Sequence, residues 1–130
     1  MVKNIVRDVF FLSQKSEPAT KADMQVAIDL QDTLQANREG CVGLAANMIG
    51  VKKNIIIVNM GFVDVIMFNP VITKKDSPYE TEEGCLSLLG GPRPCKRYQT
   101  IKVKWQNEQF QTRIKTFTGW TAQIIQHEID

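Results

Sequence analysis

The end of the sequence carries the side chains best suited to chemistry. Gln126-His127-Glu128-Ile129-Asp130 includes the only histidine of the chain, and a glutamate follows it directly. A His-Glu pair on a helix is half of the metal-hydrolase signature H-E-x-x-H, in which two histidines one turn apart bind a metal and the glutamate acts as base. The second histidine would fall at position 131, one residue past the last of this sequence. Because the sequence breaks inside the motif, we expect the natural chain to continue.

Taken alone, His127 and Cys85 each allow a second interpretation. A lone histidine on the apolar side of a helix is more often a hydrogen-bonded core residue than a metal ligand, and a single cysteine is more often a small buried hydrophobe. The chain has three cysteines, an odd number that makes a poor disulfide framework. This usage suits a reducing compartment, so we expect a cytoplasmic protein.

The composition is that of an ordinary globular protein, and the length predicts a single domain over residues 1–130. Apolar residues make up 43% of the chain and charged residues 23%. The formal net charge of +2 is too small to argue for binding to nucleic acid or to an anionic membrane. No apolar run approaches the roughly 20 residues of a membrane span. Charges interrupt residues 1–8, which argues against a signal peptide.

The first part of the chain predicts one helix and a stretch of close packing. Thr20 and Asp23 have the form of a helix N-cap, and apolar residues at helical spacing extend the helix to about Asn37. Residues 40–50 are then mostly small and include three glycines. Small residues allow another backbone to approach closely, so we expect tight packing there.

Alternating and β-branched residues predict a set of short strands in the middle of the chain. The expected strands are 54–59, 63–68 with a continuation at 71–75, 101–105, and 110–116. The four acidic residues within 76–84 predict a solvated loop, and Gly90-Gly91-Pro92-Arg93-Pro94 predicts irregular structure.

The final segment predicts a helix that opens at Thr118-Gly119-Trp120-Thr121. Its expected apolar side is Trp120, Ile124, Ile125 and Ile129. His127 and Glu128 follow Ile124 by three and four residues, so both can face the interior. The fold class expected from these elements is α+β, with short mixed or antiparallel strands packed on a C-terminal helix that carries the His-Glu pair.

Three segments, taken in order, resemble the motifs of the peptide deformylase family. The family motifs are G-x-G-x-A-A-x-Q, E-G-C-L-S and Q-H-E-x-D-H. The second is complete in residues 83–87, and the third is present in residues 126–130 without its last histidine. The first corresponds to residues 41–48, Cys-Val-Gly-Leu-Ala-Ala-Asn-Met. Three motifs in the right order make chance similarity a poor explanation.

The resemblance implies the peptide deformylase fold and a metal-dependent hydrolase that removes the formyl group from the N-terminal methionine of newly made proteins. Its substrates would be N-formyl-methionyl peptides, including nascent chains at the ribosome. The family's cofactor is one divalent metal ion, ferrous iron in the cell and zinc, nickel or cobalt in preparations. Carried over, Cys85 and His127 would hold the ion together with the histidine expected at position 131. Thiolate and imidazole ligands of this number leave one position open, as a catalytic site requires.

The same correspondence assigns the other site residues. Glu128 would take a proton from the attacking water and pass it to the leaving amine. Charge that develops on the formyl oxygen would be met by the backbone N–H of Leu86 and by the side chain at position 48. The peptide would bind as an added strand against the backbones of Val42, Gly43 and Gly84.

Two departures from the family pattern keep a second function open. Met48 stands where the family has glutamine, and methionine cannot donate a hydrogen bond to the oxyanion. Losing one such donor costs on the order of 10²–10³ in rate. Cys41 stands where the first glycine of the motif is found. These residues favour a catalytically weak or inactive paralogue that binds peptides, whereas the intact cysteine and His-Glu motifs favour the enzyme. An unrelated zinc protease would not explain the cysteine motif.

Overall fold

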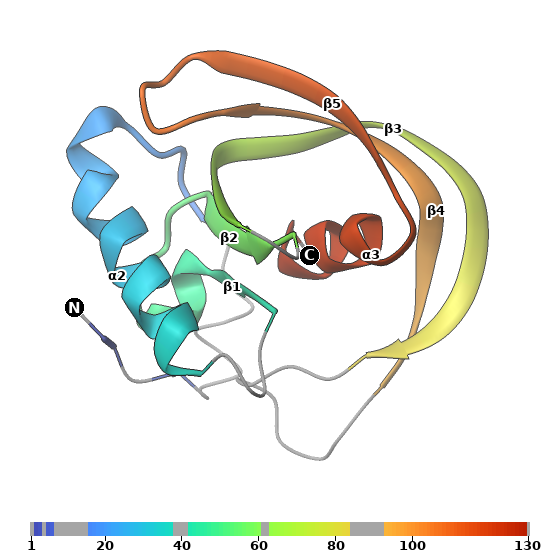
Figure 1. Ribbon diagram of the computed structural model, residues 1–130, viewed down its shortest axis with the longest axis horizontal. Coiled ribbons are helices and arrows are strands. Elements are labelled where there is room, and N and C mark those ends of the chain that lie inside the picture. Colours follow the sequence, from blue (N-terminus) through green and yellow to red (C-terminus); the bar gives the residue numbers. More distant parts are fainter. Residues whose placement is uncertain are drawn as a thin grey trace.

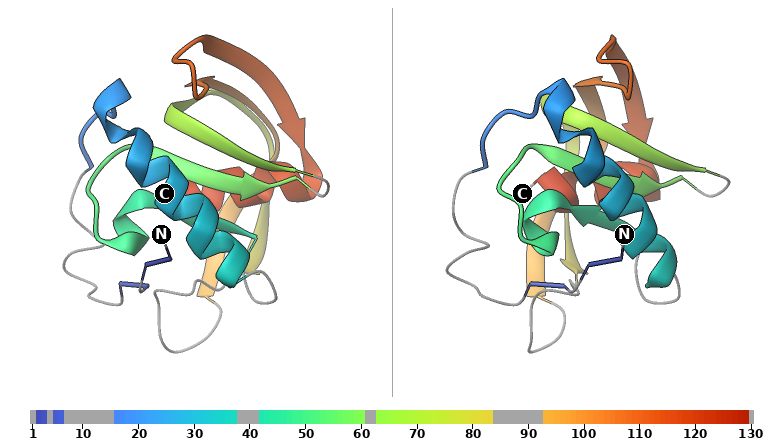
Figure 2. Two further views of the ribbon diagram at one scale, coloured as in Figure 1. Left: turned by 60° about the vertical axis from the view of Figure 1, so that its left-hand side comes forward. Right: turned by 90° about the vertical axis from the view of Figure 1, so that its left-hand side faces the viewer.

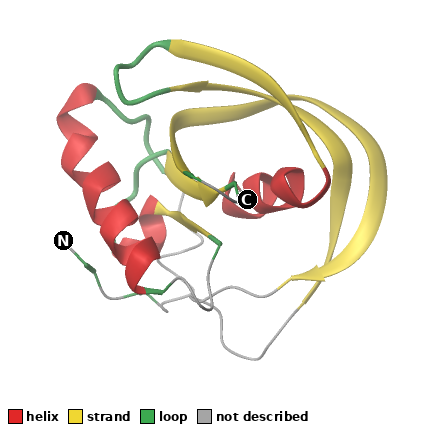
Figure 3. Cartoon of the chain, viewed as in Figure 1, coloured by secondary structure: helices red, strands yellow, loops and turns green. Residues whose placement is uncertain are grey.

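The computed structural model describes residues 2–3, 5–6, 16–37, 42–60, 63–83 and 93–129. Within these ranges, five strands form one antiparallel sheet in the order β1-β2-β3-β4-β5. The strands are β1 (Gly43–Ala45), β2 (Ile55–Asn59), β3 (Asp64–Glu83), β4 (Arg93–Gln106) and β5 (Thr112–Thr118). The helices are α2 (Met24–Ala36), α3 (Gly119–Ile129) and two short 3-10 helices, η1 (Lys21–Asp23) and η2 (Ala46–Ile49) (Figure 3). The predicted α+β class, with a C-terminal helix on antiparallel strands, is confirmed.

The sheet is strongly bent, and its curvature encloses the last helix. Figure 1 shows β3, β4 and β5 curling around α3, whereas α2 lies outside this curve on the other side of β1 and β2. The views in Figure 2 show α2 running across the outside of the sheet. The two helices therefore cover opposite faces of its first strands. None of the helices in the described ranges is long and apolar enough to cross a membrane.

Strand β2 is buried on both faces because its apolar side chains alternate between the two helices. Ile55 and Ile57 join the cluster that includes Leu30 of α2, and Ile56 and Val58 join the cluster that includes Ile125 of α3. A run of β-branched residues suits such a doubly covered strand. The predicted strand at 54–59 is thus confirmed, and it supplies the common wall against which both helices pack.

Helix α2 starts as the sequence predicts. The Thr20 hydroxyl accepts a hydrogen bond from the backbone N–H of Ala22, and the Asp23 carboxylate accepts one from the backbone N–H of Thr20. This capping box satisfies N–H groups that have no partner within the helix. One difference is that the first turn, Lys21–Asp23, is a 3-10 helix, and the α-helix runs from Met24 to Ala36.

Two loop predictions were wrong where the structure describes the chain; Gly84 and residues 90–92 lie outside the described ranges. Residues 76–83 continue β3, and Arg93 and Pro94 already belong to β4. The acidic residues that suggested a solvated loop lie in a ladder, where Glu80 stands directly opposite Lys96. Cross-strand pairs of opposite charge stabilise such a ladder, so a charged segment can be a strand when its partner strand is basic.

Asn69 joins three parts of the fold where β3 changes register. Its backbone has a positive φ of 53°, a conformation that asparagine tolerates better than most residues. Its side chain accepts a hydrogen bond from Ala19 N at 2.7 Å and donates to Ala19 O at 3.0 Å and to Gln106 Oε1 at 2.8 Å. The register shift lies between Phe68 and Val71. The predicted interruption of the strand at Asn69-Pro70 is therefore a bulge within β3.

An Asn69→Ala variant is expected to lose about 2–4 kcal/mol of free energy of unfolding, because three hydrogen bonds disappear and alanine disfavours the positive φ. Urea unfolding would measure the change. Asn69→Asp keeps the acceptor for the Ala19 N–H and should lose less. A change below about 0.5 kcal/mol for Asn69→Ala, typical of an unimportant surface position, would contradict this role.

Candidate active site

Helix α3 begins where β5 ends, at a position whose backbone conformation favours glycine. Gly119 has a φ of +61°, which lets the chain turn from the strand directly into the helix. The helix then buries Ala122, Ile124 and Ile125 inside the curved sheet. The predicted helix start is confirmed. The predicted apolar side is wrong at one position, because the Trp120 side chain is 61% exposed.

The carboxylate of Glu128 is buried against the backbone of β1. Glu128 is only 9% exposed. A Cβ atom added to Gly43 would lie 2.9 Å from Glu128 Oε2 and 3.1 Å from Glu128 Cγ, and also 3.1 Å from Ile124 Cγ2. These separations are shorter than a side chain allows, so α3 can approach β1 this closely only because residue 43 is glycine. The small-residue segment at Gly43 therefore meets the His-Glu segment in the fold, although residues 43 and 127 are 84 positions apart in the sequence.

This contact predicts that Gly43→Ala lowers the free energy of unfolding by about 1–3 kcal/mol through overpacking. Gly43 is not among the described residues with positive φ, so the cost should come from crowding and not from the backbone. In a Glu128→Ala background two of the three close contacts are gone, and the same substitution should cost less. A double-mutant cycle followed by urea unfolding measures this coupling, and strictly additive effects would contradict the contact.

His127 is half-buried and lies one residue before Glu128 on the same helix. Successive residues of an α-helix point about 100° apart, so the imidazole and the carboxylate project in different directions. The two side chains can therefore do different work at one site: Glu128 points at β1 while His127 points to one side of it.

The Met48 side chain is turned toward its own loop and the core. It is 5% exposed and belongs to the hydrophobic cluster beneath α2. Its sulfur accepts a hydrogen bond from the backbone N–H of Ala45 at 3.4 Å. Ala45 precedes η2, and Met48 is the third residue of that helix, so the sulfur stands where a capping-box acceptor would. Met48 holds the loop together in this way, and it offers no hydrogen-bond donor.

Strand β1 lies at the edge of the sheet next to Glu128. It pairs with β2 only, and among the described residues no strand pairs with its other edge. The backbone N–H of Asn59 donates to Val42 O at 2.8 Å, which extends the pairing by one residue. A strand at the edge of a sheet can present backbone groups to an extended peptide. Gly43 begins this edge strand and Val42 directly precedes it, and both are predicted substrate-binding residues.

Several predicted site residues lie outside the described ranges: Cys41, Gly84, Cys85 and Leu86. Among the residues that are described, no group of three or more histidine, cysteine, aspartate or glutamate side chains is placed to hold a metal ion. The described part supplies one imidazole, on His127, with a buried carboxylate beside it. An imidazole nitrogen is a donor that divalent metals such as zinc and iron accept.

Gln126 belongs to the third motif, but the sequence does not indicate what its side chain does. The side chain is 4% exposed and bonds to the backbone of Tyr98 in β4. One signal was available: Gln126 directly follows Ile125, on the apolar side of the predicted helix, where a polar side chain needs a hydrogen-bond partner. Its partner could not be found from the sequence, since a backbone group as acceptor leaves no mark on residue type.

Comparison with known proteins agrees with this geometry. A model of the family described as polypeptide deformylase matches residues 3–130. The peptide deformylase of Clostridium beijerinckii is 60% identical over 130 residues, which cover all of this chain and 95% of the relative. The crystal structure of peptide deformylase from Thermotoga maritima superimposes with a TM-score of 0.89 at 29% identity, covering all of this chain and 90% of the other.

A further solved structure carries a bound peptide. It is a Met-Ala-Ser-bound class I type b peptide deformylase from Acinetobacter baumannii, with a TM-score of 0.86 and 29% identity over all of this chain and 93% of that one. The matched family model spans nearly the whole sequence, and the relative at 60% identity is matched over almost its full length. The chain therefore belongs to the peptide deformylase family, whose members are metal-dependent hydrolases.

Proposed function

We propose that this chain performs the reaction of its family, hydrolysis of the formyl group from N-terminal formyl-methionyl peptides, at the place where α3 meets β1. The observation that carries the proposal is the burial of the Glu128 carboxylate against Gly43. A general base must be held close to the bond that reacts, and here it lies beside a sheet edge that can receive a peptide.

Cys85 and His127 would hold the metal ion of the site, together with a histidine supplied at position 131. We propose ferrous iron as the ion in the cell, with zinc, nickel or cobalt able to replace it. When bound, the ion would polarise the formyl group and lower the pKa of a water molecule. Elemental analysis of a chain extended with that histidine should find about one ion per chain. An equal metal content in a Cys85→Ala variant would count against the cysteine as a ligand.

Glu128 would move the proton that the reaction requires. Its carboxylate accepts a proton from water as the water oxygen bonds to the formyl carbon, and it returns the proton to the nitrogen as the C–N bond breaks. The products are formate and a peptide with a free amino terminus. Burial suits this work, because the low dielectric near the carboxylate strengthens its interactions with the reacting atoms. The N–H of Leu86 would donate to the formyl oxygen.

The substrate would lie along β1 as an added strand, with its backbone paired to Val42 and Gly43 and, across the site, to Gly84. The Met-Ala-Ser peptide bound to the relative from Acinetobacter baumannii supports this class of ligand. In the cell the substrates would be nascent chains that emerge from cytoplasmic ribosomes. We further infer that residues 1–130 act as one domain.

The role of Met48 as a loop residue without a donor favours a second candidate, a weak or inactive paralogue that binds peptides. One assay separates the two. The chain extended by a histidine at position 131 is loaded with iron or nickel without oxygen, and formate release from formyl-Met-Ala-Ser is measured. Turnover well above the metal alone is expected. Peptide binding without turnover would support the paralogue and would overturn the enzyme.

A further inference from the structure

The side chain of Gln126 continues the hydrogen-bond ladder of the sheet beyond the end of a strand. Strand β5 pairs with β4 as far as Thr118 opposite Thr100, and the chain then turns into α3. Tyr98 lies on β4 two residues before Thr100, at the next position that β5 would have reached. Tyr98 N donates to Gln126 Oε1 at 2.9 Å, and Gln126 Nε2 donates to Tyr98 O at 2.9 Å. The amide thus takes the place of the next backbone unit that β5 would have supplied.

The Gln126 amide is well satisfied and cannot easily be replaced by another side chain. Its Nε2 also donates to Ala122 O, one turn earlier in α3, at 2.9 Å. Both backbone groups of Tyr98 point toward Gln126, so they point away from Pro78, the residue opposite Tyr98 on β3. An apolar side chain at position 126 would leave the N–H and C=O of Tyr98 without these partners, in a part of the sheet that α3 covers.

The same contact fixes how α3 is rolled about its own axis. Gln126 faces Tyr98 of β4, whereas Ile124 and Glu128, which lie one turn apart, face Gly43 of β1. Residues two apart on a helix point about 200° apart, so β4 and β1 hold α3 from nearly opposite sides. His127 points between these two directions. Apolar packing alone is non-directional, but a paired amide permits only one roll and one axial position of the helix.

We infer that Gln126 is a positioning residue of this site: by bonding to Tyr98 it sets the roll of α3 and thereby aims His127 at the metal ion and Glu128 at the reacting bond. The inference rests on the proposed function, because it assigns Gln126 a role toward that metal and that base. Residues that orient a ligand from outside the ligand set typically change metal affinity or activity by about 10- to 100-fold when they are replaced.

The test uses the chain extended by a histidine at position 131, with cobalt as the probe. Gln126→Met keeps the length of the side chain and removes all three hydrogen bonds, whereas Gln126→Glu keeps only the acceptor for the Tyr98 N–H. Asn69→Ala is the control for stability, since its bonds tie Ala19 and Gln106 to β3 and do not involve α3. Cobalt affinity by chelator competition, the visible spectrum of the cobalt form, and kcat and KM are measured for each folded protein.

For Gln126→Met we expect cobalt affinity to fall by about 10- to 100-fold, with an altered cobalt spectrum and a lower kcat at saturating metal. KM should change little, because β1 and its edge are untouched, and Gln126→Glu should lie between. Asn69→Ala should keep the cobalt affinity and spectrum of the parent. If Gln126→Met does not fold, the same comparison is made with Gln126→Glu.

Parent-like cobalt affinity, spectrum and kcat in the Gln126 variants would overturn the inference, even if they unfold at lower urea concentration. A parent chain that binds cobalt but releases no formate would contradict the proposed function alone, and the cobalt measurements would still decide the role of Gln126. A parent chain that binds no cobalt would contradict both.

Discussion

Replacing Glu128 with glutamine is expected to lower kcat for deformylation by about 10²–10⁴-fold, the usual contribution of a positioned general base. Glutamine has nearly the same shape, so it can occupy the space beside Gly43, but its amide cannot accept the proton from water. Metal content and KM should change far less than kcat. Steady-state kinetics with formyl-Met-Ala-Ser, on preparations of equal metal content, measures the effect.

The matched control is Glu108→Gln, the same chemical change at an exposed residue between β4 and β5. It should leave kcat and KM at the parent values. The interpretation of Glu128 as the base would be wrong if Glu128→Gln kept more than about a tenth of the parent kcat, since a base contributes at least about 10²-fold.

The second large expected effect is an increase in kcat. Met48→Gln is expected to raise kcat by about 10²–10³-fold, because it adds one donor for the developing oxyanion. Methionine and glutamine have unbranched stems and side chains of similar length, and Met48 already accepts the Ala45 N–H through its sulfur. In the variant, the amide oxygen can take over this bond and leave the NH₂ group to donate. The loop should therefore keep its form while the site gains the missing function.

A cost in stability should accompany this gain. Without substrate, the new NH₂ group is buried with no assured partner, so the free energy of unfolding should fall by about 1–3 kcal/mol. Met48→Leu also lacks a donor and should show no gain in kcat. An unchanged kcat in Met48→Gln would mean that other groups already stabilise the oxyanion and that position 48 does not limit the rate.

The parts of the fold that depend on local chemistry could be predicted from the sequence. The capping residues Thr20 and Asp23 marked the start of the first helix, and the β-branched run at 54–59 marked a strand covered on both faces. Each signal resides in residue types at short spacing, where propensity and periodicity act directly.

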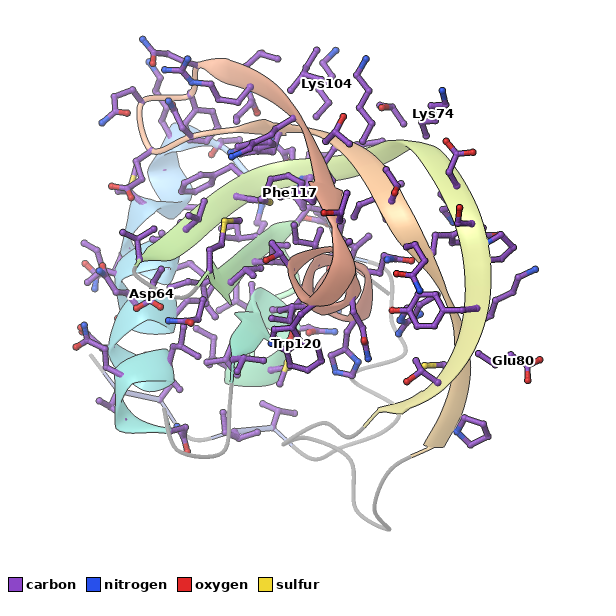
Figure 4. All side chains as sticks on the ribbon, turned by 45° about the vertical axis from the view of Figure 1, so that its right-hand side comes forward. Asp64, Lys74, Glu80, Lys104, Phe117 and Trp120 are labelled. Atoms are coloured by element: carbon purple, nitrogen blue, oxygen red, sulfur yellow. The ribbon has the colours of Figure 1, made fainter. Side chains whose placement is uncertain are left out.

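The parts that depend on distant contacts could not be predicted. Residues 76–83 looked like a solvated loop because they are rich in acidic residues. In the fold they pair with β4, where Glu80 stands opposite Lys96, and the sequence does not reveal this pairing. Trp120 fits an apolar helix stripe, yet the bent sheet leaves it exposed near the start of α3, as Figure 4 shows. In the same figure, Lys74, Lys104 and Glu80 project from the outer side of that sheet, away from α3.

The candidate site divides in the same way. Residue type and motif order pointed to His127 and Glu128, but not to what holds them in place. The Gly43 backbone against Glu128 and the Tyr98 backbone against Gln126 are contacts of main chain with side chain. Only the fold reveals such contacts, because any residue can supply a backbone group and the sequence does not record which one does.

The central claim is that α3 and β1 together form a deformylating site with Glu128 as its base. The most direct test is formate release from formyl-Met-Ala-Ser by the extended, iron-loaded chain and by its Glu128→Gln variant at equal iron content. Turnover by the parent and a loss of about 10²-fold or more in the variant are expected. Formate release at the same rate by both proteins, or by neither, would contradict it.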